Sequence, residues 1–390
     1  MHPLLLPLGI GLAGGQIATV FLFGIHASFL DIAVIFLLVG TMLMQHTRFI
    51  PAHWAPILGF AGASLLSIVY HASEIPVFWS AIAGLYVMRF LMYASLYWVT
   101  ASPVFRKEHV FTMLAGSGLL IAILGLIQFF LYPDLRNLYY LGWDPHLNRL
   151  FSTILDPNFA GIILAFTAFL FIGFLSSKKK LHALAGLLIV LMALVLTYSR
   201  SSYIAFGAGL LVWGLLSGRK AIAGFLLTTS VFLMLIVPHA GEGQNLLRVT
   251  SSLARVETIS RAVSLFTKHP FIGAGMNTLL HNNLTAGVST GQTIPSLTGS
   301  GVDTSLLYAA ATSGILGLFL ITWLLLICVH IGRMGLRASG PVKEASALFL
   351  AGLTSLIIHS LFVNSLFYPW VLVWLFMTLG VMERWVRADR

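Results

Sequence analysis

Long apolar runs dominate this chain and follow one another with short polar links over most of its length. A helix needs about 20 mostly apolar residues to cross the roughly 30 Å hydrocarbon core of a bilayer. Runs of this kind centre near residues 13, 38, 62, 88, 120, 166, 189, 210, 229, 316, 353 and 376. The pattern therefore predicts an all-α membrane protein with about twelve transmembrane helices, forming a single polytopic domain over residues 1–390.

One long polar segment interrupts this pattern, residues 239–302, between the ninth and tenth predicted spans. Within it, residues 251–268 have the period of an amphipathic helix. At about 100° per residue, its apolar face holds Val256, Ile259, Ala262, Val263 and Phe266. Arg255 falls with this face, whereas Arg261 lies opposite, four residues after Glu257, as in a solvated ion pair. We therefore expect Arg255 to point towards the protein and Arg261 towards water.

Composition agrees with a membrane protein. The chain is 58% hydrophobic and 9% charged, with a mean hydropathy of +0.94, whereas a soluble domain has roughly a quarter of its residues charged. The formal net charge of +10 arises mainly from cations in short connections, where they orient spans and meet anionic lipid. We therefore expect membrane lipid, and not nucleic acid, as a partner. The single cysteine, Cys328, excludes an intrachain disulfide.

Lysines and arginines gather in alternate connections and in the C-terminal tail. Since cytoplasmic loops are enriched in these residues, we expect both termini in the cytoplasm and residues 239–302 on the outer side. The N-terminus has no Lys/Arg-rich start of the signal-peptide kind, so Leu4 to Phe23 is expected to be a retained first span. The chain has no inverted repeat of the kind many transporters show, which weakens a transporter interpretation.

Two polar motifs are expected at the outer surface. Asp156 and Pro157 open the sixth span, as a capping residue and a first-turn proline normally do, but the amide of Asn158 has no such simple reason. Between the seventh and eighth spans, Ser199 and Ser201 flank Arg200. A guanidinium with neighbouring hydroxyls suits an anionic head group, although a hairpin needs polar residues in any case and a lone arginine can snorkel.

Arg89 lies near the middle of the fourth predicted span. A charge at that depth costs at least about 3 kcal/mol, so it must face a cavity or a partner. One account is a structural pair with a carboxylate inside the membrane. Because the spans contain almost no acidic residues, we instead expect an anionic ligand or a water-filled cleft.

Two residues are alternative general bases. His281, followed by Asn282, stands in the polar segment, where most histidines are simply solvated. Asp303 precedes the tenth span and could equally cap it. The sequence has no Walker-type glycine loop, no His/Cys metal spacing and no glycosidase-like carboxylate pair. A metal-independent reaction at an anionic leaving group is what this inventory favours, and we expect no cofactor.

Several motifs, in this order, are similar to one known family. They are Asp156-Pro157-Asn158, Tyr198-Ser199-Arg200-Ser201, Arg255 followed by His269-Pro270-Phe271-Ile272-Gly273-Ala274-Gly275, His281-Asn282, and Ser313-Gly314-Ile315-Leu316-Gly317. Together they resemble the O-antigen ligase and O-antigen polymerase superfamily over roughly residues 150–335. The chain departs from the family pattern where residues 284–301 separate His281-Asn282 from the next span, so Asp303 shares the assignment of base with His281.

The resemblance implies a glycosyltransferase of the bacterial inner membrane with its active site on the outer side. Such enzymes move a glycan from an undecaprenyl diphosphate carrier to a sugar hydroxyl, on lipid A-core for a ligase or on another carrier-linked repeat for a polymerase. It implies that Arg200 and Arg255 engage the diphosphate and that His281 corresponds to the family's loop histidine. We further expect Arg89 to act as a deeper helper, and Asn158, Ser199, Ser201 and Asn282 to support the site. The alternatives from other classes are a transporter or flippase of lipid-linked glycans, and a structural partner in an envelope complex.

Overall fold

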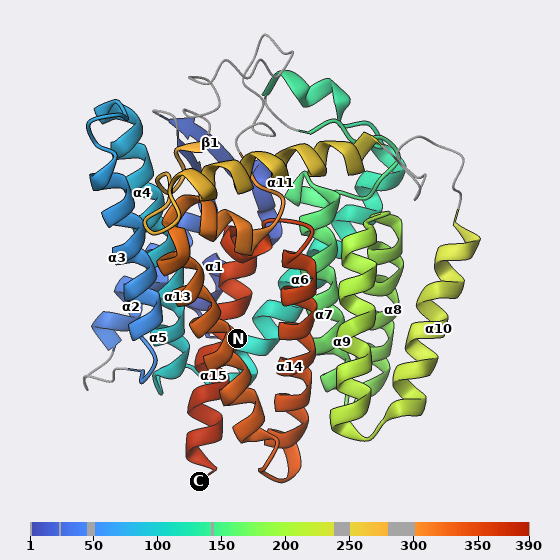
Figure 1. Ribbon diagram of the computed structural model, residues 1–390. Coiled ribbons are helices and arrows are strands. Elements are labelled where there is room, and N and C mark those ends of the chain that lie inside the picture. The colour runs from blue at the N-terminus through green and yellow to red at the C-terminus, as the bar shows by residue number, and fades with distance from the viewer. Residues whose placement is uncertain are drawn as a thin grey trace.

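The computed structural model describes residues 2–22, 25–44, 51–141, 144–237, 250–279 and 301–389. These residues are mostly helical (Figure 1). The N-terminal part has helices α1 (Leu5–Gly14), α2 (Phe29–Met44), α3 (Ala55–Tyr70), α4 (Val77–Ala94), α5 (Leu96–Ala101) and α6 (Lys107–Leu131). Short elements join them: the 3-10 turns η1 (Gly15–Ala18), η2 (Arg136–Leu141) and η3 (Ser152–Ile154), and the strands β1 (Thr19–Leu22) and β2 (Ile25–Ser28).

The C-terminal part continues the bundle. Its helices are α7 (Pro157–Phe174), α8 (Lys180–Leu196), α9 (Arg200–Ser217), α10 (Lys220–Ile236), α11 (Thr250–Lys268), α13 (Ser305–Gly335), α14 (Gly340–Ser360) and α15 (Pro369–Ala388), with the 3-10 turn η5 (Ser365–Phe367) before the last helix. Most of these helices run side by side, while α11 crosses one end of the bundle, opposite the C-terminus (Figure 1).

Each of the twelve predicted centres lies inside a helix. Among the described residues, five helical segments are long and apolar enough to cross a membrane: Val77–Ala101, Lys107–Leu131, Pro157–Phe174, Ser305–Gly335 and Gly340–Ser360. Five further apolar helices are shorter, between 10 and 17 residues. The helical membrane architecture is thus confirmed, and the number of twelve spans stays a prediction.

The first span is shorter than expected. The helical stretch ends at Ala18, where the sequence was expected to continue as a span to Phe23, and the chain enters an antiparallel hairpin that pairs Thr19 with Ser28 and Leu22 with Ile25. Gly15 has a φ of +61°, and a Cβ there would lie 2.2 Å from the carbonyl oxygen of Thr153. Only glycine fits this close approach, so the helix ends against the turn that precedes α7.

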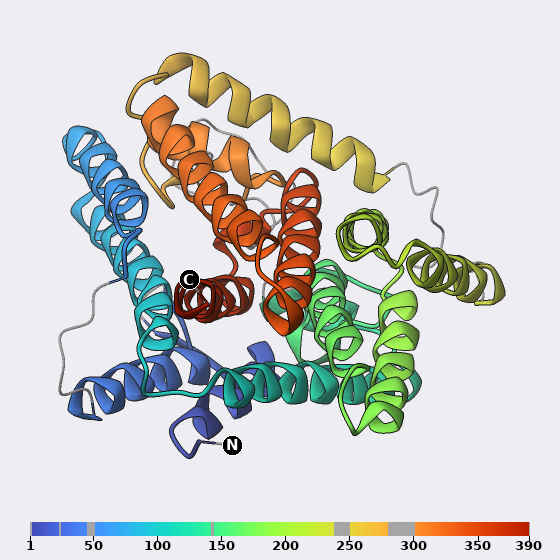
Figure 2. The same ribbon diagram turned by 90° about the horizontal axis from the view of Figure 1, so that it is seen from below.

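Small residues let the central helices approach closely. A Cβ on Gly209 of α9 would lie 2.3 Å from Ser355 Oγ of α14, and this hydroxyl donates a 2.8 Å hydrogen bond to the carbonyl oxygen of Ala205. Viewed along the bundle, α15 lies near its middle, with α14, α7 and α6 around it (Figure 2). Small residues that bring backbones together are the usual means of packing helices in a membrane.

A glycine-rich segment after α11 fills a kink in α13. Gly314 breaks that helix with a φ of 67° and ψ of −165°. The carbonyl oxygens of Ala311 and Thr312 instead accept hydrogen bonds from the amides of Ala274 (2.9 Å) and Gly275 (3.1 Å). Backbone groups inside a membrane protein need such partners, so the two glycine motifs of the sequence meet and fix α11 against the bundle.

This docking predicts a sharp difference between two glycines with similar backbone angles. Gly273 (φ +79°) would place a Cβ 2.3 Å from the Thr312 backbone carbon, whereas Gly218 (φ +73°) has nothing within 4 Å. Both alanine variants bear a strain of about 1–2 kcal/mol, but only Gly273→Ala must also displace α13. We expect Gly273→Ala to lower the melting temperature clearly more than Gly218→Ala in detergent; equal shifts would contradict the docking.

Candidate functional site

The N-termini of α7 and α9 lie next to each other at the α11 end of the bundle. Asp156 caps α7: its Oδ1 accepts hydrogen bonds from the amides of Asn158 (2.6 Å) and Phe159 (3.1 Å). Ser199 caps α9, where its Oγ accepts from the Ser202 amide at 3.4 Å. Because a helix N-terminus has a partial positive charge, two such ends side by side favour an anion nearby.

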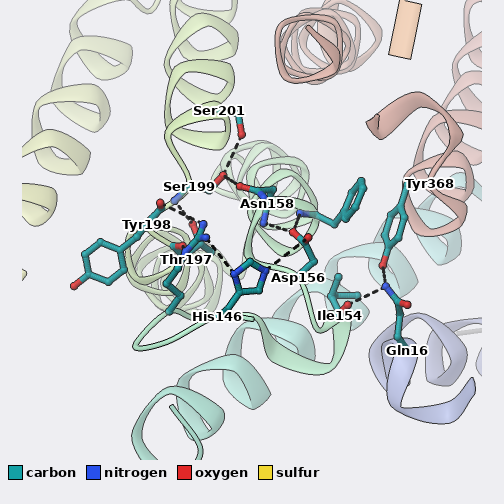
Figure 3. Close-up of polar contacts among 12 residues, drawn as sticks. Gln16, His146, Ile154, Asp156, Asn158, Thr197, Tyr198, Ser199, Ser201 and Tyr368 are labelled. Carbon is teal, nitrogen blue, oxygen red and sulfur yellow. Dashed lines mark hydrogen bonds and ion pairs between the residues drawn. The ribbon is translucent and has the colours of Figure 1, made fainter. Parts of the chain in front are cut away.

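Asn158 joins the two helix ends. Its Oδ1 accepts a 2.9 Å hydrogen bond from Ser199 Oγ, and Ser201 Oγ lies 3.1 Å from the same hydroxyl (Figure 3). His359 of α14, a residue that sequence reasoning missed, continues the chain of contacts: its Nε2 lies 3.2 Å from the hydroxyls of both Ser201 and Ser202. Asn158, Ser199 and Ser201, which were predicted to support the site, therefore lie together. Next to them is His359, which is fully buried.

A second polar group lies on the other side of Asp156. Arg149 is only 4% exposed, and its guanidinium donates to the carbonyl oxygens of Thr197 (3.0 Å) and Tyr198 (3.4 Å). His146 Nδ1 lies 3.5 Å from Arg149 Nη1, and its Nε2 lies 4.0 Å from Asp156 Oδ2 (Figure 3). Neither residue is among the candidates predicted from the sequence. Each is ordinary in a link between spans, and only the fold places it beside Asp156.

The helix α11 adds a third group. Thr258 Oγ1 donates a 3.0 Å hydrogen bond to Asp303 Oδ2, just before α13 begins. Burial lowers the pKa of the Arg255 guanidinium, while the carboxylate of Asp303 acts in the opposite direction. The Arg255 side chain also interacts electrostatically with Arg200, which lowers its pKa, and with Asp156, which raises it. The structure thus places Arg255 within electrostatic range of Arg200, Asp303 and Asp156, the residue that caps α7.

Acidic side chains lie close to one another near the N-terminus of α7. Burial, followed by the charges of Asp156 and Asp303, raises the pKa of Asp144 to about 7. Burial also raises the pKa of Asp156, against the hydrogen bonds from its own helix and the charge of Arg149. Asp144, His146 and Asp156 present ligand atoms within 4.8 Å of one another, so they could hold a metal ion. This group was not predicted, because Asp144 and His146 are separated in the sequence from Asp156 and the three do not have the spacing of a His/Cys metal motif.

The raised pKa of Asp144 predicts a pH effect on stability. With its pKa raised from 3.8 to about 7, the folded protein binds a proton that the unfolded chain releases, so unfolding free energy falls as pH rises from about 4 to about 7. Asp144→Asn should remove this contribution, making the variant gain stability relative to the parent at pH 8 but not at pH 4. Thermal unfolding at both pH values checks this, and a constant difference between the two proteins would contradict it.

The helical wheel of α11 is confirmed for its ion pair and only in part for its apolar face. Arg261 Nη2 lies 2.5 Å from Glu257 Oε1. Arg255, Thr258 and Ala262 lie on the covered side, whereas three of the predicted inward residues are exposed: Val256 (64%), Ile259 (37%) and Val263 (45%). The helix is thus rotated so that its polar residues Arg255 and Thr258 meet the bundle.

Arg89 does not face a free cleft. The expectation of an anionic ligand or a water-filled cleft is wrong, because its Nε and Nη2 donate to Asp31 Oδ1 (2.7 Å) and Oδ2 (2.9 Å) at the start of α2. The Tyr93 hydroxyl donates to the same carboxylate at 2.8 Å. Asp31 neutralises the charge for which a ligand was proposed, so the contacts of Arg89 support a structural ion pair.

Breaking this pair should destabilise the protein. The side chains of Arg89 and Asp31 are 17% and 15% exposed, and leaving one buried charge alone costs about 3–5 kcal/mol. Arg89→Leu should therefore lower the melting temperature strongly, and adding Asp31→Leu should restore most of the loss. A double variant as unstable as the sum of the single variants would show that the two charges do not act as a pair.

The structure leaves two predicted residues untested. His281 and Asn282 lie outside the described residues, so their role stays a prediction. In the described part, the site combines carboxylates, arginines and hydroxyls at two helix ends. Such a set can bind a phosphate-bearing group through Arg200 and Arg255 and accept a proton at Asp303.

Comparison with known proteins gives a match over part of the chain. Residues 185–322 match the family model described as O-antigen ligase. The matched segment contains Ser199, Arg200, Ser201, Arg255 and Asp303, and it runs from α8 into α13. A search of curated proteins gave no match. Residues 185–322 of this helical chain are thus similar to the O-antigen ligase family, which supports the resemblance noted in the sequence.

Proposed function

We propose that this protein transfers a glycan from an undecaprenyl-diphosphate carrier to a sugar hydroxyl, as an O-antigen ligase-like enzyme. One observation carries the proposal. Arg255 of α11 interacts electrostatically with Arg200 of α9, with Asp303 and with Asp156 at the start of α7, and Asp303 is hydrogen-bonded to α11. Two cations and carboxylates from distant segments of the chain therefore lie close together. The same place lies at the end of the bundle crossed by α11 (Figure 1), which we assign to the outer side of the bacterial inner membrane, with both termini in the cytoplasm.

In the proposed reaction, the acceptor hydroxyl oxygen bonds to the anomeric carbon while the bond from that carbon to the carrier diphosphate breaks. Negative charge grows on the leaving diphosphate, and Arg200 and Arg255 stabilise it. Attack on the face opposite the leaving group inverts the anomeric configuration. The hydroxyl proton passes to the carboxylate of Asp303, or to His281 if that residue is the base.

The buried hydroxyl network would hold the arginine-bearing turn in place. Ser199 and Ser201 flank Arg200, and their contacts to Asn158 and His359 fix the start of α9. A residue whose neighbours are locked in this way loses little freedom when it binds a phosphate, which favours transfer. Because two arginines supply the positive charge, the proposed reaction needs no metal ion.

The test uses purified protein with a synthetic undecaprenyl-diphosphate glycan and either of two acceptors, lipid A-core or a second carrier-linked repeat. Transfer to lipid A-core supports the ligase, and transfer to the repeat supports the polymerase alternative. Product NMR then reports whether the anomeric configuration is inverted. Retention of configuration would contradict the direct displacement.

A parallel reaction with EDTA examines the metal-capable group of Asp144, His146 and Asp156. Unchanged rates are expected. Loss of transfer with EDTA, restored by Mg²⁺ or Mn²⁺, would overturn metal independence and assign that group to the reaction.

A further inference from the structure

A large apolar cavity lies at the end of the bundle opposite α11. It has a volume of about 600 Å³ and is bounded by α6, α7, α14 and α15. These four helices are neighbours in the view along the bundle (Figure 2). Its wall is mainly aromatic and aliphatic, with Phe166, Phe169 and Phe174 from α7 facing Trp374 of α15. This volume is within the range of about 300–1,000 Å³ that is typical of ligand pockets.

The mouth of the cavity is polar and lies among cations. Arg219 and Glu344 line it and form an ion pair of 3.1 Å, with side chains 40% and 23% exposed. Further exposed lysines lie within four residues of the lining residues Ser176, Arg219 and Glu344 in the sequence: Lys178, Lys179, Lys180, Lys220 and Lys343. The cavity therefore has an apolar interior, and its mouth has a net positive charge.

The deep end of the cavity is separate from the site described above. Leu356 is the lining residue of α14 closest to that site. His359 lies one helical turn further, buried among Ser201, Ser202 and Ser365. The lining of the cavity thus reaches the basic end of the bundle and stops one helical turn before His359.

We propose that this cavity binds one acyl chain of an anionic phospholipid, whose phosphate lies against the cations at the mouth. Apolar cavities accept apolar ligands, and three of the helices that line this one, α6, α7 and α14, are long and apolar enough to cross a membrane. Anionic head groups are attracted by each nearby lysine or arginine. The lipid is a fixed structural partner, independent of the proposed glycosyl transfer.

The experiment compares three proteins. Gly352 lines the cavity, and the nearest atom to a Cβ there is Phe166 Cδ1 at 3.8 Å, so Gly352→Phe should fill the space. Gly224 of α10 is exposed and has nothing within 4 Å, which makes Gly224→Phe a matched control. Each protein is reconstituted with dioleoylphosphatidylglycerol or dioleoylphosphatidylcholine, extracted in detergent, and examined by native mass spectrometry.

We expect one bound phosphatidylglycerol on the parent and on Gly224→Phe, and none on Gly352→Phe. The parent should retain about fivefold less phosphatidylcholine than phosphatidylglycerol. Retention by Gly352→Phe equal to that of the control, or equal retention of both lipids, would overturn the proposal. Polyprenyl diphosphate found in the cavity in place of phospholipid would also overturn it, in favour of the carrier tail.

A second measurement does not depend on the folding of Gly352→Phe. In vesicles of phosphatidylglycerol brominated on its acyl chains, Trp374, which is 3% exposed, should be quenched only by a chain inside the cavity. Quenching should therefore be smaller in Trp374→Phe than in the parent. An equal quenched fraction in the two proteins would contradict an occupied cavity.

Discussion

Arg255→Ala is expected to lower the rate of glycan transfer by about 10²-fold or more, because removing a group that stabilises charge mainly in the transition state has effects of this size. The Arg255 guanidinium interacts with Asp303, Arg200 and Asp156 at the proposed site. Initial rates of carrier diphosphate release, measured with saturating donor, give the change in kcat.

Arg261→Ala is the matched control. Arg261 lies on the same helix but pairs with Glu257 at 2.5 Å, so its loss should leave the rate within about twofold, as expected for an i,i+4 surface pair. If Arg261→Ala abolished transfer while Arg255→Ala remained active, the assigned orientation of α11 towards the site would be wrong.

Asp303→Asn is expected to lower kcat by about 10²–10⁴-fold, the range that a positioned general base contributes. The amide keeps the size of the side chain and can still accept the hydrogen bond from Thr258, which lies 3.0 Å away, but it cannot take the acceptor proton. Folding should therefore be preserved, and a melting curve checks this.

The comparison with His281 decides between the two bases. His281→Ala should stay within about tenfold of the parent if Asp303 is the base. The reverse order, with Asp303→Asn active and His281→Ala inactive, would assign the proton transfer to His281. Thr258→Val, which removes only the hydroxyl that contacts Asp303, should have an intermediate effect.

The helices of this protein could be predicted because each apolar run is long and continuous. All twelve predicted centres lie in helices, since runs of this length leave the backbone few alternatives in a membrane. The failure near residue 19 has a local cause. The approach of Gly15 to Thr153 ends the helix, and a contact between residues so distant in sequence has no trace in the pattern around residue 15.

The candidate site was predictable where a residue was unusual for its place. Arg200 between serines and Arg255 on an apolar face both stood out, and the structure brings them together. His146 and Arg149 did not stand out, because polar residues are normal in a link between spans. His359, near the end of an apolar helix, matters through Ser201 and Ser202, which come from a helix more than 150 residues earlier.

Arg89 shows the opposite error. It was the most conspicuous charge in the sequence, and its partner Asp31 is separated from it by 58 residues. The cost of a buried charge correctly predicted a partner, but the choice between ligand and carboxylate needed the packing of α2 against α4.

The most direct test of the central claim follows the bond between carrier and glycan. Purified protein in proteoliposomes receives an undecaprenyl-diphosphate glycan labelled in both the lipid and the sugar, and acceptor is then added. We predict that free carrier diphosphate appears only with acceptor, one per glycan transferred, and that this release is lost in Arg255→Ala. Movement of the donor across the bilayer with both labels still joined, and no release on adding acceptor, would contradict it and indicate a transporter.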